Sequence, residues 1–357
     1  MLLLSIDNIK RNMKLAKNIY AADGRVLLSE GMVLTDAYIE RLKQLNITSL
    51  YITDDRIGKV EVDELVKIQT KVEAVKVIQE VLNCIPNGKD WSGQKVRQAV
   101  CSIMEDLVNH RKVLFDLVDI RALNDYTFFH SLGVCILSLM TGLMAGYDNS
   151  KLTELGMAAI LHDVGKTLIS DEVLNKLAQL TPDEYLEVQK HTLVGYDLLR
   201  QKDDINPEAA LVAIQHHERM DGSGYPNGLK GAEIHEFAKI VAIADVYDAL
   251  STDRVYRKRW MPHQVIEYIR DKGKVLFDQD FCKIFLENIA PFPIGSMVLL
   301  NNGEKAIVIK VTKEIPARPV VKVIEDEEGT SLNEPFDVDL KWDLTRFISK
   351  AIQDEEA

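Results

Sequence analysis

The sequence predicts a multidomain, mainly α-helical protein, in which an all-α domain is flanked by a small N-terminal α/β module and a small C-terminal β domain. Three observations predict this. Apolar residues recur at helical spacing between about 92 and 290, strand-like runs surround a helix-like run before residue 60, and short alternating runs with NG and EG turns follow residue 295. The 357 residues leave room for two or three cores, because single cores seldom grow beyond about 250 residues.

Residues 1–60 have the pattern of the small α/β module. The expected elements are a strand at 13–20 (MKLAKNIY), a turn at 21–24 (AADG), the run RVLLSEG at 25–31, a helix at 36–45 (DAYIERLKQL) ending at Asn46, and TSLYIT at 48–53. Strand, helix and strand in this order are enough for one small core.

Residues 61–100 are expected to form a linker helix region. From Val62 onward, Leu65, Ile68, Val72 and Val75 are spaced by three or four, which predicts a helix over Leu65–Leu82 that could pair with a second copy of the chain in a homodimer. The segment IPNG at 85–88 interrupts this pattern, because proline and glycine end helices. We therefore expect a hinge or boundary there.

The all-α domain is expected to occupy residues 101–290 with roughly eight helices, because β-branched alternation is scarce there. After PFPIG at 291–295 the chain changes to VLLNN, KAIVIKV and PVVKVIED, which predicts the β domain at 291–357. Its last residues, DEEA, form an acidic tail.

Composition restricts the partners and the compartment. The net charge of −12 argues against general binding to nucleic-acid polymers or anionic membranes. Four cysteines lie far apart without a CxxC pair (Cys84, Cys101, Cys135 and Cys282), which predicts free buried thiols in a reducing compartment. The opening MLLL is too short for a signal peptide, and no apolar run approaches the ~20 residues of a membrane span. A cytoplasmic protein is therefore expected.

Seven side chains of the central domain could bind metal, and they occur on different predicted helices or helix ends. They are His130, His162, Asp163, His191, His216, His217 and Asp245. Asp245 shares a helix face with Val241 and Asp248, His162 follows Leu155 and Ala159, and His130 precedes Val134 and Leu137. All three would point into a core, where a polar group costs free energy unless it finds a partner.

Each of these residues alone has an ordinary explanation. A lone inward histidine is usually a hydrogen-bonded core residue, and a lone buried aspartate often caps a helix or meets an arginine. Seven such residues facing one core would leave many polar groups unsatisfied unless a metal is bound. Imidazole and carboxylate without cysteine suit Fe, Mn, Zn, Ni or Co. Seven ligands exceed the needs of one ion, so we expect two ions sharing a carboxylate, a site suited to phosphodiester hydrolysis.

Three segments then carry a resemblance to a known family. HDVGK at 162–166, HHERMDGSGYP at 216–226 and ADVYDALSTDRVYRKRW at 244–260 occur in the order and spacing of the HD-GYP family. That family is the branch of the HD phosphohydrolase superfamily that cleaves the bacterial second messenger cyclic di-GMP. The resemblance covers roughly residues 100–290, and it implies that the all-α domain is of the HD type.

The resemblance also implies roles for individual residues. His130, His162, Asp163 and Asp245 would hold one divalent ion, foremost Fe or Mn, while Asp163 bridges to a second ion held by His191, His216 and His217. Metal-bound hydroxide would attack the phosphorus, and Lys166 would contact the scissile phosphate, so Asp163 and Lys166 are the expected catalytic pair. Asp248, Arg254 and Arg257 would hold the dinucleotide, whose cleavage gives linear pGpG first, with either pGpG or GMP as the end product. In the loop, Gly224 and Tyr225 would shape the pocket, and Tyr225 could also touch a base.

One residue departs from the family pattern, and the sequence also allows two alternative functions. Family members with a third metal have a glutamate four residues before the first histidine, where this chain has Tyr126; Asp125 lies one residue off the matching position, so a two-metal site is expected. The chain could instead hydrolyse another nucleotide. It could also sense a cyclic dinucleotide and act on partner signalling proteins with little turnover. Lys258 and Arg259 are expected to be solvated.

Overall fold

The structure of the chain is a computed structural model. It describes residues 1–21, 25–45, 47, 49–54, 56–58, 64–109, 126–174, 176, 178–252 and 259–352, without the side chains of 126 and 127. The expected turn at 22–24, the helix end at Asn46, the start at Val62, Asp125 and the acidic tail lie outside the described residues. The described residues form two compact units, one from the helical middle of the chain and one from its two ends.

The division into units differs from the expected arrangement of modules. The helical unit comprises the described residues of 66–111 and 126–288, so it includes the predicted linker helix. The N-terminal and C-terminal parts, expected as two modules, share the other unit. Their cores explain this, because Ile307 and Ile324 of the C-terminal part are buried in one apolar cluster with Leu15, Ile19 and Leu50 of the N-terminal part.

The N-terminal part contains two short antiparallel strand pairs and one helix. Strand β1 (Leu2–Ser5) pairs with β4 (Ser49–Ile52), β2 (Ile19–Tyr20) pairs with β3 (Val26–Leu28), and η1 (Ile6–Asn8) follows β1. Helix α1 (Asp36–Gln44) begins after Thr35, whose side chain accepts a hydrogen bond from the backbone N–H of Tyr38. The pattern at 36–45 therefore predicted this helix to within one residue at its C-terminal end.

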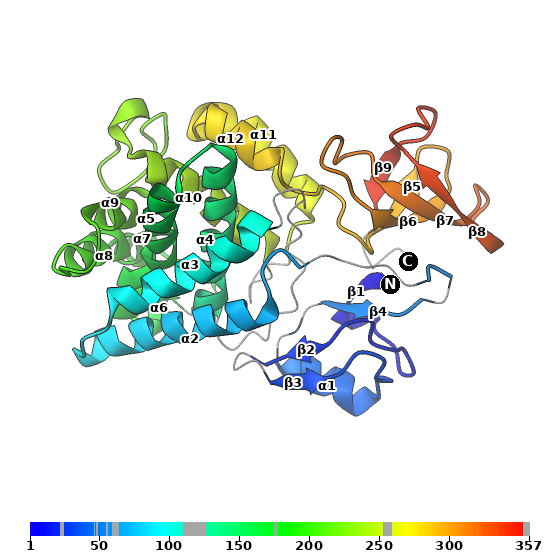
Figure 1. The fold of residues 1–357 in the computed structure, drawn as a ribbon, viewed down its shortest axis with the longest axis horizontal. Coiled ribbons are helices and arrows are strands. Elements are labelled where there is room, and N and C mark those ends of the chain that lie inside the picture. Colours follow the sequence, from blue (N-terminus) through cyan, green and yellow to red (C-terminus); the bar gives the residue numbers. More distant parts are fainter. Residues whose placement is uncertain are drawn as a thin grey trace. The chain divides into compact units, whose positions relative to one another are not determined.

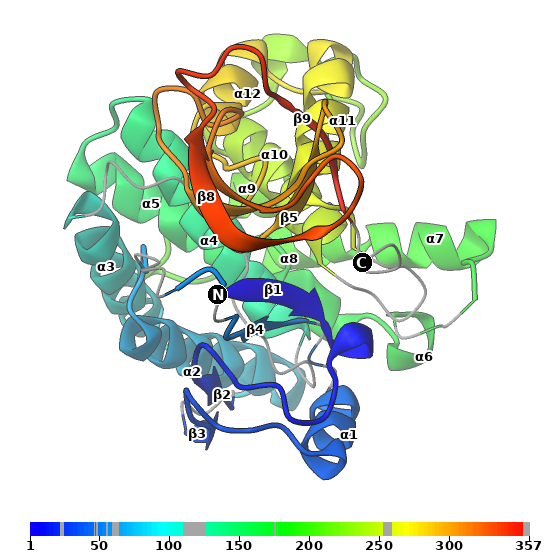
Figure 2. The same cartoon turned by 90° about the vertical axis from the view of Figure 1, so that its right-hand side faces the viewer.

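The C-terminal part is a curved five-stranded antiparallel sheet (Figure 2). Its strands are β5 (Met297–Leu300), β6 (Lys305–Lys310), β7 (Val320–Glu325), β8 (Ser331–Asp339) and β9 (Ile348–Ala351), in the order β8-β7-β6-β5-β9. Side chains alternate between the two faces: Ala306 and Val308 belong to one apolar cluster, whereas Ile307 belongs to the cluster shared with the N-terminal part. Both faces of the sheet are thus covered.

The helical unit consists of α-helices (Figure 1), and three of the segments between them contain short 3-10 turns. The α-helices are α2 (Ile68–Cys84), α3 (Gly93–Asn109), α4 (Tyr126–Met144), α5 (Asn149–Leu161), α6 (Asp171–Leu174), α7 (Pro182–Gln189), α8 (His191–Leu199), α9 (Pro207–Gln215), α10 (Glu236–Ser251), α11 (Pro262–Leu276) and α12 (Gln279–Leu286). The 3-10 turns are η2 (Ile85–Asn87), η4 (Val164–Leu168) and η5 (Gly231–Glu233). The described part of the range 101–290 thus holds more helices than the eight expected, because α6 and α7 are too short to show a clear period.

Helices α4, α5 and α10 pack together at the centre of this unit. Helix α5 is buried without interruption from Leu155 to Leu161, and α10 is buried over most of its length. Helices that are apolar all round belong in a core. Polar side chains on these helices are therefore buried as well, which is the setting that the sequence predicted for the candidate metal ligands.

Helix α2 begins later than predicted, at Ile68. Asp106 of α3 fixes this start, because its carboxylate accepts hydrogen bonds from the Lys67 N–H at 3.1 Å and from the Thr70 hydroxyl at 2.7 Å. The apolar stripe that was expected to pair with a second copy is already covered, since α2 packs against α3 and α4 with Val72 and Val75 buried. The expected interruption at 85–88 is present as η2.

Two further expectations concern cysteines and membranes. All four cysteines are free, as predicted; Cys135 and Cys282 are also buried, whereas Cys84 and Cys101 are partly exposed, contrary to the prediction. Among the described residues, no helix combines the length and the apolar character that crossing a bilayer requires.

Candidate active site

The seven predicted ligands converge in the helical unit. They form two groups in which the ligand atoms lie within 4.8 Å of one another: Asp163, His191, His216 and His217 in one, and His130, His162 and Asp245 in the other. Their elements are far apart in the sequence, because His130 comes from α4 and Asp245 from α10, while the others stand at the ends of α5, α8 and α9. The packing of α4, α5 and α10 brings these positions together.

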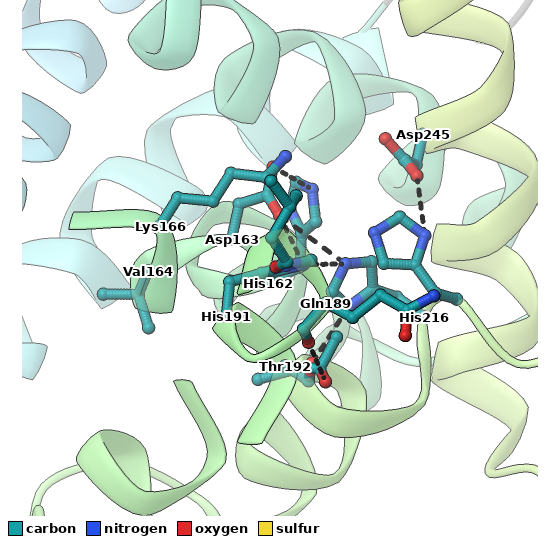
Figure 3. A network of polar contacts seen from close by, with 12 residues as sticks. His162, Asp163, Val164, Lys166, Gln189, His191, Thr192, His216 and Asp245 are labelled. Atoms are coloured by element: carbon teal, nitrogen blue, oxygen red, sulfur yellow. Dashed lines mark hydrogen bonds and ion pairs between the residues drawn. The ribbon is translucent and has the colours of Figure 1, made fainter. Parts of the chain in front are cut away.

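Asp163 lies between the two groups, and its two carboxylate oxygens face different ones (Figure 3). Oδ2 is 3.3 Å from Nε2 of His162 and 3.6 Å from Nε2 of His130. Oδ1 is 3.4 Å from Nε2 of His191 and 3.5 Å from Nε2 of His216. A carboxylate with one oxygen on each side is the geometry of a bridging ligand between two ions.

Three of the histidines are oriented by the ends of helices. The last carbonyls of a helix have no partner within the helix, so an imidazole N–H near its end can donate to them. His162 donates from Nδ1 to the carbonyl of Ala159 at 2.7 Å. In the same way, Nδ1 of His191 donates to the carbonyl of Val188 at 2.6 Å, and Nδ1 of His216 donates to the carbonyl of Ala213 at 3.0 Å. Each Nδ1 therefore carries the proton, and each Nε2 presents a lone pair to the site.

His130 obtains the same orientation from a side chain. Its Nδ1 lies 2.7 Å from Oδ2 of Asp248, which is fully buried, and its Nε2 lies 3.2 Å from Oδ1 of Asp245. The sequence resemblance implied that Asp248 contacts the dinucleotide. The structure instead places this carboxylate behind His130, where it orients the imidazole.

The charge state of the site favours cation binding. Burial lowers the pKa of His191 to about 3, and it also holds the pKa values of His216 and His217 below the usual range, so these rings are neutral near pH 7. Burial alone would raise the pKa of Asp163, but the charge of Lys166 beside the carboxylate is the largest opposing cause, and the pKa lies well below its usual range. Neutral imidazoles around an ionised carboxylate are the protonation states that metal binding requires.

Unsatisfied buried atoms test whether a metal fits. Nε2 of His162 and Oδ1 of Asp163 are buried without a hydrogen-bond partner. Nε2 of His191 and Nε2 of His216 face each other at 3.4 Å, although both rings keep their proton on Nδ1. Two lone pairs at this distance repel unless a cation lies beside them, and buried acceptors without partners cost free energy. The residues present therefore fit divalent metal ions.

Lys166 is the predicted cation beside the ligands. It follows Asp163 by three residues on η4, and its ammonium contacts Oδ2 of Asp163 while the side chain stays partly exposed (Figure 3). A cation that is both next to the bridging carboxylate and open to solvent can meet an anionic group that enters the site. The phosphate contact of Lys166 stays a prediction.

The loop after His217 is anchored by a residue that the sequence reading missed. Glu218 is buried, and its carboxylate accepts the backbone N–H groups of Asn227 at 2.7 Å and Leu229 at 3.0 Å. The ring of Tyr225 stacks on that of His217 with centroids 4.7 Å apart. The only sequence signal for Glu218 is its place beside His217, because loop anchors have no period.

Close approach and backbone angle explain why two positions of this loop are glycine. A Cβ on Gly224 would lie 2.4 Å from Cα of Glu218 and 2.5 Å from the His217 carbonyl oxygen, so no larger residue fits. Gly222 has a φ of +84°, which glycine adopts without strain. His216 is the C-cap of α9, so the adjacent pair His216 and His217 stands where the chain leaves the helix.

Several predicted residues cannot be compared with the structure. Arg254, Arg257 and Lys258 lie outside the described residues, as does the side chain of Tyr126. The expected dinucleotide contacts of Arg254 and Arg257, and the two-metal argument from Tyr126, therefore stay predictions.

Replacing Asp248 by asparagine should weaken metal binding without unfolding the chain. The amide keeps a similar shape but loses the negative charge that makes the His130 imidazole a stronger ligand, and the loss of such a partner typically costs about 10- to 100-fold in metal affinity. Calorimetric titration with Mn²⁺ measures this loss. Asp197→Asn is the matched control, because Asp197 is exposed on α8 and pairs with Arg200. Equal affinities of both variants would contradict the assigned role of Asp248.

Comparison with known proteins agrees with this arrangement. Residues 102–281 match the family model described as HD domain, and residues 297–357 match the KOW domain associated with HD domain. The cyclic di-GMP phosphodiesterase PA4108 of Pseudomonas aeruginosa is 32% identical over 224 residues, which cover 63% of this chain and 54% of that protein. The cyclic di-GMP phosphodiesterase response regulator RpfG of Xanthomonas campestris is 42% identical over 146 residues, 40% of this chain and 39% of that protein.

A third relative is named for a different nucleotide. The 3'3'-cGAMP-specific phosphodiesterase 2 of Vibrio cholerae is 38% identical over 144 residues, which cover 40% of this chain and 28% of that protein. The chain spans about half the length of the curated relatives it matches, or less.

Proposed function

Because this chain belongs to the HD domain family, we propose that it is a metal-dependent phosphodiesterase that hydrolyses cyclic di-GMP to linear pGpG and then to GMP. The observation that carries the proposal is the position of Asp163, whose two carboxylate oxygens face two separate groups of histidines. The names of the relatives PA4108 and RpfG support the choice of substrate.

The proposed site holds two divalent ions, Fe or Mn foremost, with Zn, Ni or Co as further candidates. One ion would be held by His130, His162, Asp245 and Oδ2 of Asp163. The other would be held by His191, His216, His217 and Oδ1 of Asp163. When bound, such ions supply a water that ionises near neutral pH and positive charge that stabilises the phosphoryl oxygens.

The chain's own residues would orient and neutralise the substrate. The carbonyls of α5, α7 and α9 and the carboxylate of Asp248 hold the imidazoles in position, so little reorganisation is needed during reaction. The ammonium of Lys166 would move from Asp163 to a phosphate oxygen of the substrate, because both partners are anionic. Arg254 and Arg257 are proposed for the second phosphate on the sequence resemblance alone.

The remaining parts of the proposal concern setting and partners. Four free cysteines suit a reducing compartment, so we place the chain in the cytoplasm, where partner signalling proteins would also act. The relative named for 3'3'-cGAMP makes that nucleotide the second candidate substrate. A sensor with little turnover is less well supported, because all seven ligands are present.

The decisive experiment measures products with defined metal content. The purified chain, loaded with Fe²⁺ or Mn²⁺ under anaerobic conditions, is incubated with cyclic di-GMP, and nucleotides are separated by chromatography. We expect pGpG followed by GMP, and no product from protein stripped with a chelator. Binding without product would favour the sensor, whereas hydrolysis of 3'3'-cGAMP alone would favour the second substrate.

A further inference from the structure

Tyr185 is an exposed aromatic residue close to the site that the proposed mechanism does not use. It lies on α7, which stands out from the other helices of its unit in Figure 2, and it is 49% exposed. Its ring meets that of Tyr225 edge to face, with centroids 6.3 Å apart and an interplanar angle of 75°. One part of the ring thus contacts the loop and the rest faces solvent.

The rings of Tyr185, Tyr225 and His217 form a continuous series. His217 and Tyr225 stack at 4.7 Å, and Tyr185 extends the series outward by one more ring contact. His217 belongs to a metal-ligand group, so the series leads from the expected position of a phosphate to the surface. In a nucleotide one sugar separates the base from the phosphate, and in this series the ring of Tyr225 separates Tyr185 from His217.

Helix α7 holds Tyr185 rigidly for such a short element. Thr181 and Glu184 form a capping box, in which the Thr181 N–H donates to Glu184 at 2.7 Å and the Glu184 N–H donates to the Thr181 hydroxyl at 3.3 Å. Lys176 adds an ion pair to Glu184 at 2.6 Å, and Pro182 occupies the first turn. A fixed ring loses little entropy when a ligand stacks on it.

Exposed apolar side chains are concentrated in this region. Of the six large hydrophobic residues that are exposed among the described residues of the helical unit, four fall between 168 and 193: Leu168, Tyr185, Leu186 and Leu193. Leu168 follows Lys166 by two residues on η4, and η4 packs against α8. Leu168, two residues from Lys166, and the ring of Tyr185 are the apolar groups that we consider for a ligand that is anionic at one end and flat and apolar at the other.

We propose that Tyr185 stacks against a purine base of the bound cyclic dinucleotide and so favours nucleotides over smaller phosphodiesters. The inference rests on the proposed function, which supplies the substrate. Base stacking on an aromatic side chain depends on its π face and tolerates a change of base. Tyr185 is thus a substrate-binding residue, whereas Tyr225 contacts Tyr185 on one side and the proposed metal ligand His217 on the other.

The test compares two substrates. Wild type, Tyr185→Ala and Tyr185→Phe are loaded with Mn²⁺ and assayed on cyclic di-GMP and on methyl 4-nitrophenyl phosphate, a diester without a purine. Tyr185→Ala should raise KM for cyclic di-GMP by roughly 5- to 100-fold, the size of stacking effects found by alanine substitution. Its activity on the small diester should stay at the wild-type level. Tyr185→Phe keeps the ring and should behave as wild type on both.

Leu186→Ala is the matched control, since Leu186 is 57% exposed on the same helix; it should keep the wild-type KM. An equal loss on both substrates in Tyr185→Ala would overturn the inference, because Tyr185 would then act by holding Tyr225 and His217. An unchanged KM, or the same loss in Leu186→Ala, would overturn it too. A wild-type chain active on the small diester but not on cyclic di-GMP would overturn the proposed function and this inference together.

Discussion

Replacing Asp163 by alanine is expected to reduce turnover of cyclic di-GMP by roughly three orders of magnitude or more. Asp163 is the only described side chain that lies within 3.6 Å of ligand nitrogens from both metal groups. Its removal deletes one ligand from each proposed ion and leaves Lys166 without its carboxylate partner. Metal content per chain, measured by mass spectrometry after gel filtration, should fall together with activity.

Asp163→Asn refines this result, because an amide can offer one oxygen to one ion but cannot bridge two as a charged carboxylate does. We expect it to keep the fold and retain at most one ion per chain. Asp197→Ala, on the exposed side of α8, controls for the loss of an acidic group. A variant without the Asp163 carboxylate that still binds two ions and turns over at the wild-type rate would refute the bridging role.

Replacing Gly165 by alanine is expected to lower the free energy of unfolding by about 3 kcal/mol or more. A Cβ at this position would lie 2.0 Å from the His191 carbonyl oxygen and 2.6 Å from the backbone nitrogen of Gly195. Both atoms belong to the backbone of α8, so the helix itself must move. Since His191 is the first residue of α8, its Nε2 should leave Oδ1 of Asp163, now 3.4 Å away, and metal binding by that group should weaken.

Gly195→Ala provides a matched control from the same contact. Its Cβ would lie 3.4 Å from Cβ of Ala213 and 3.4 Å from the Gly165 nitrogen, which is ordinary van der Waals contact. Alanine also favours a helix over glycine by about 1 kcal/mol, so this variant should be as stable as wild type. Denaturant unfolding followed by circular dichroism compares the two. Similar stabilities for both variants would show that η4 and α8 do not meet as closely as described.

Much of this site was predictable, because buried polar residues can be recognised in the sequence by their apolar neighbours at helical spacing. His130, His162 and Asp245 stand among apolar residues at helical spacing, which is improbable for polar groups without a partner, and all three face one another in the structure. The role of Asp248 was harder to predict. Helical spacing places it one turn after Asp245, but only coordinates show that its carboxylate reaches Nδ1 of His130.

Features that depend on non-local packing were not predictable. The alternation of side chains along β6 places Ile307 on the opposite face of the sheet from Ala306 and Val308. Nothing in the sequence indicates, however, that the N-terminal part covers Ile307. An apolar stripe on α2 was predicted, but a stripe does not indicate its partner: α3 and α4 of the same chain pack against α2, in which Val72 and Val75 are buried. The structural role of Gly165 was not predicted either, because a close approach between η4 and α8 produces no sequence pattern.

The hydrogen bonds that orient the imidazoles have a consequence for mutational robustness. For His162, His191 and His216 the acceptor is a main-chain carbonyl three residues earlier, which no ordinary substitution can delete. These orientations also depend only on neighbouring residues, so each can form as soon as its own stretch of chain folds. His130 depends on a side chain 118 residues away. Random mutation should therefore damage the orientation of one ligand, through Asp248, far more readily than that of the other three.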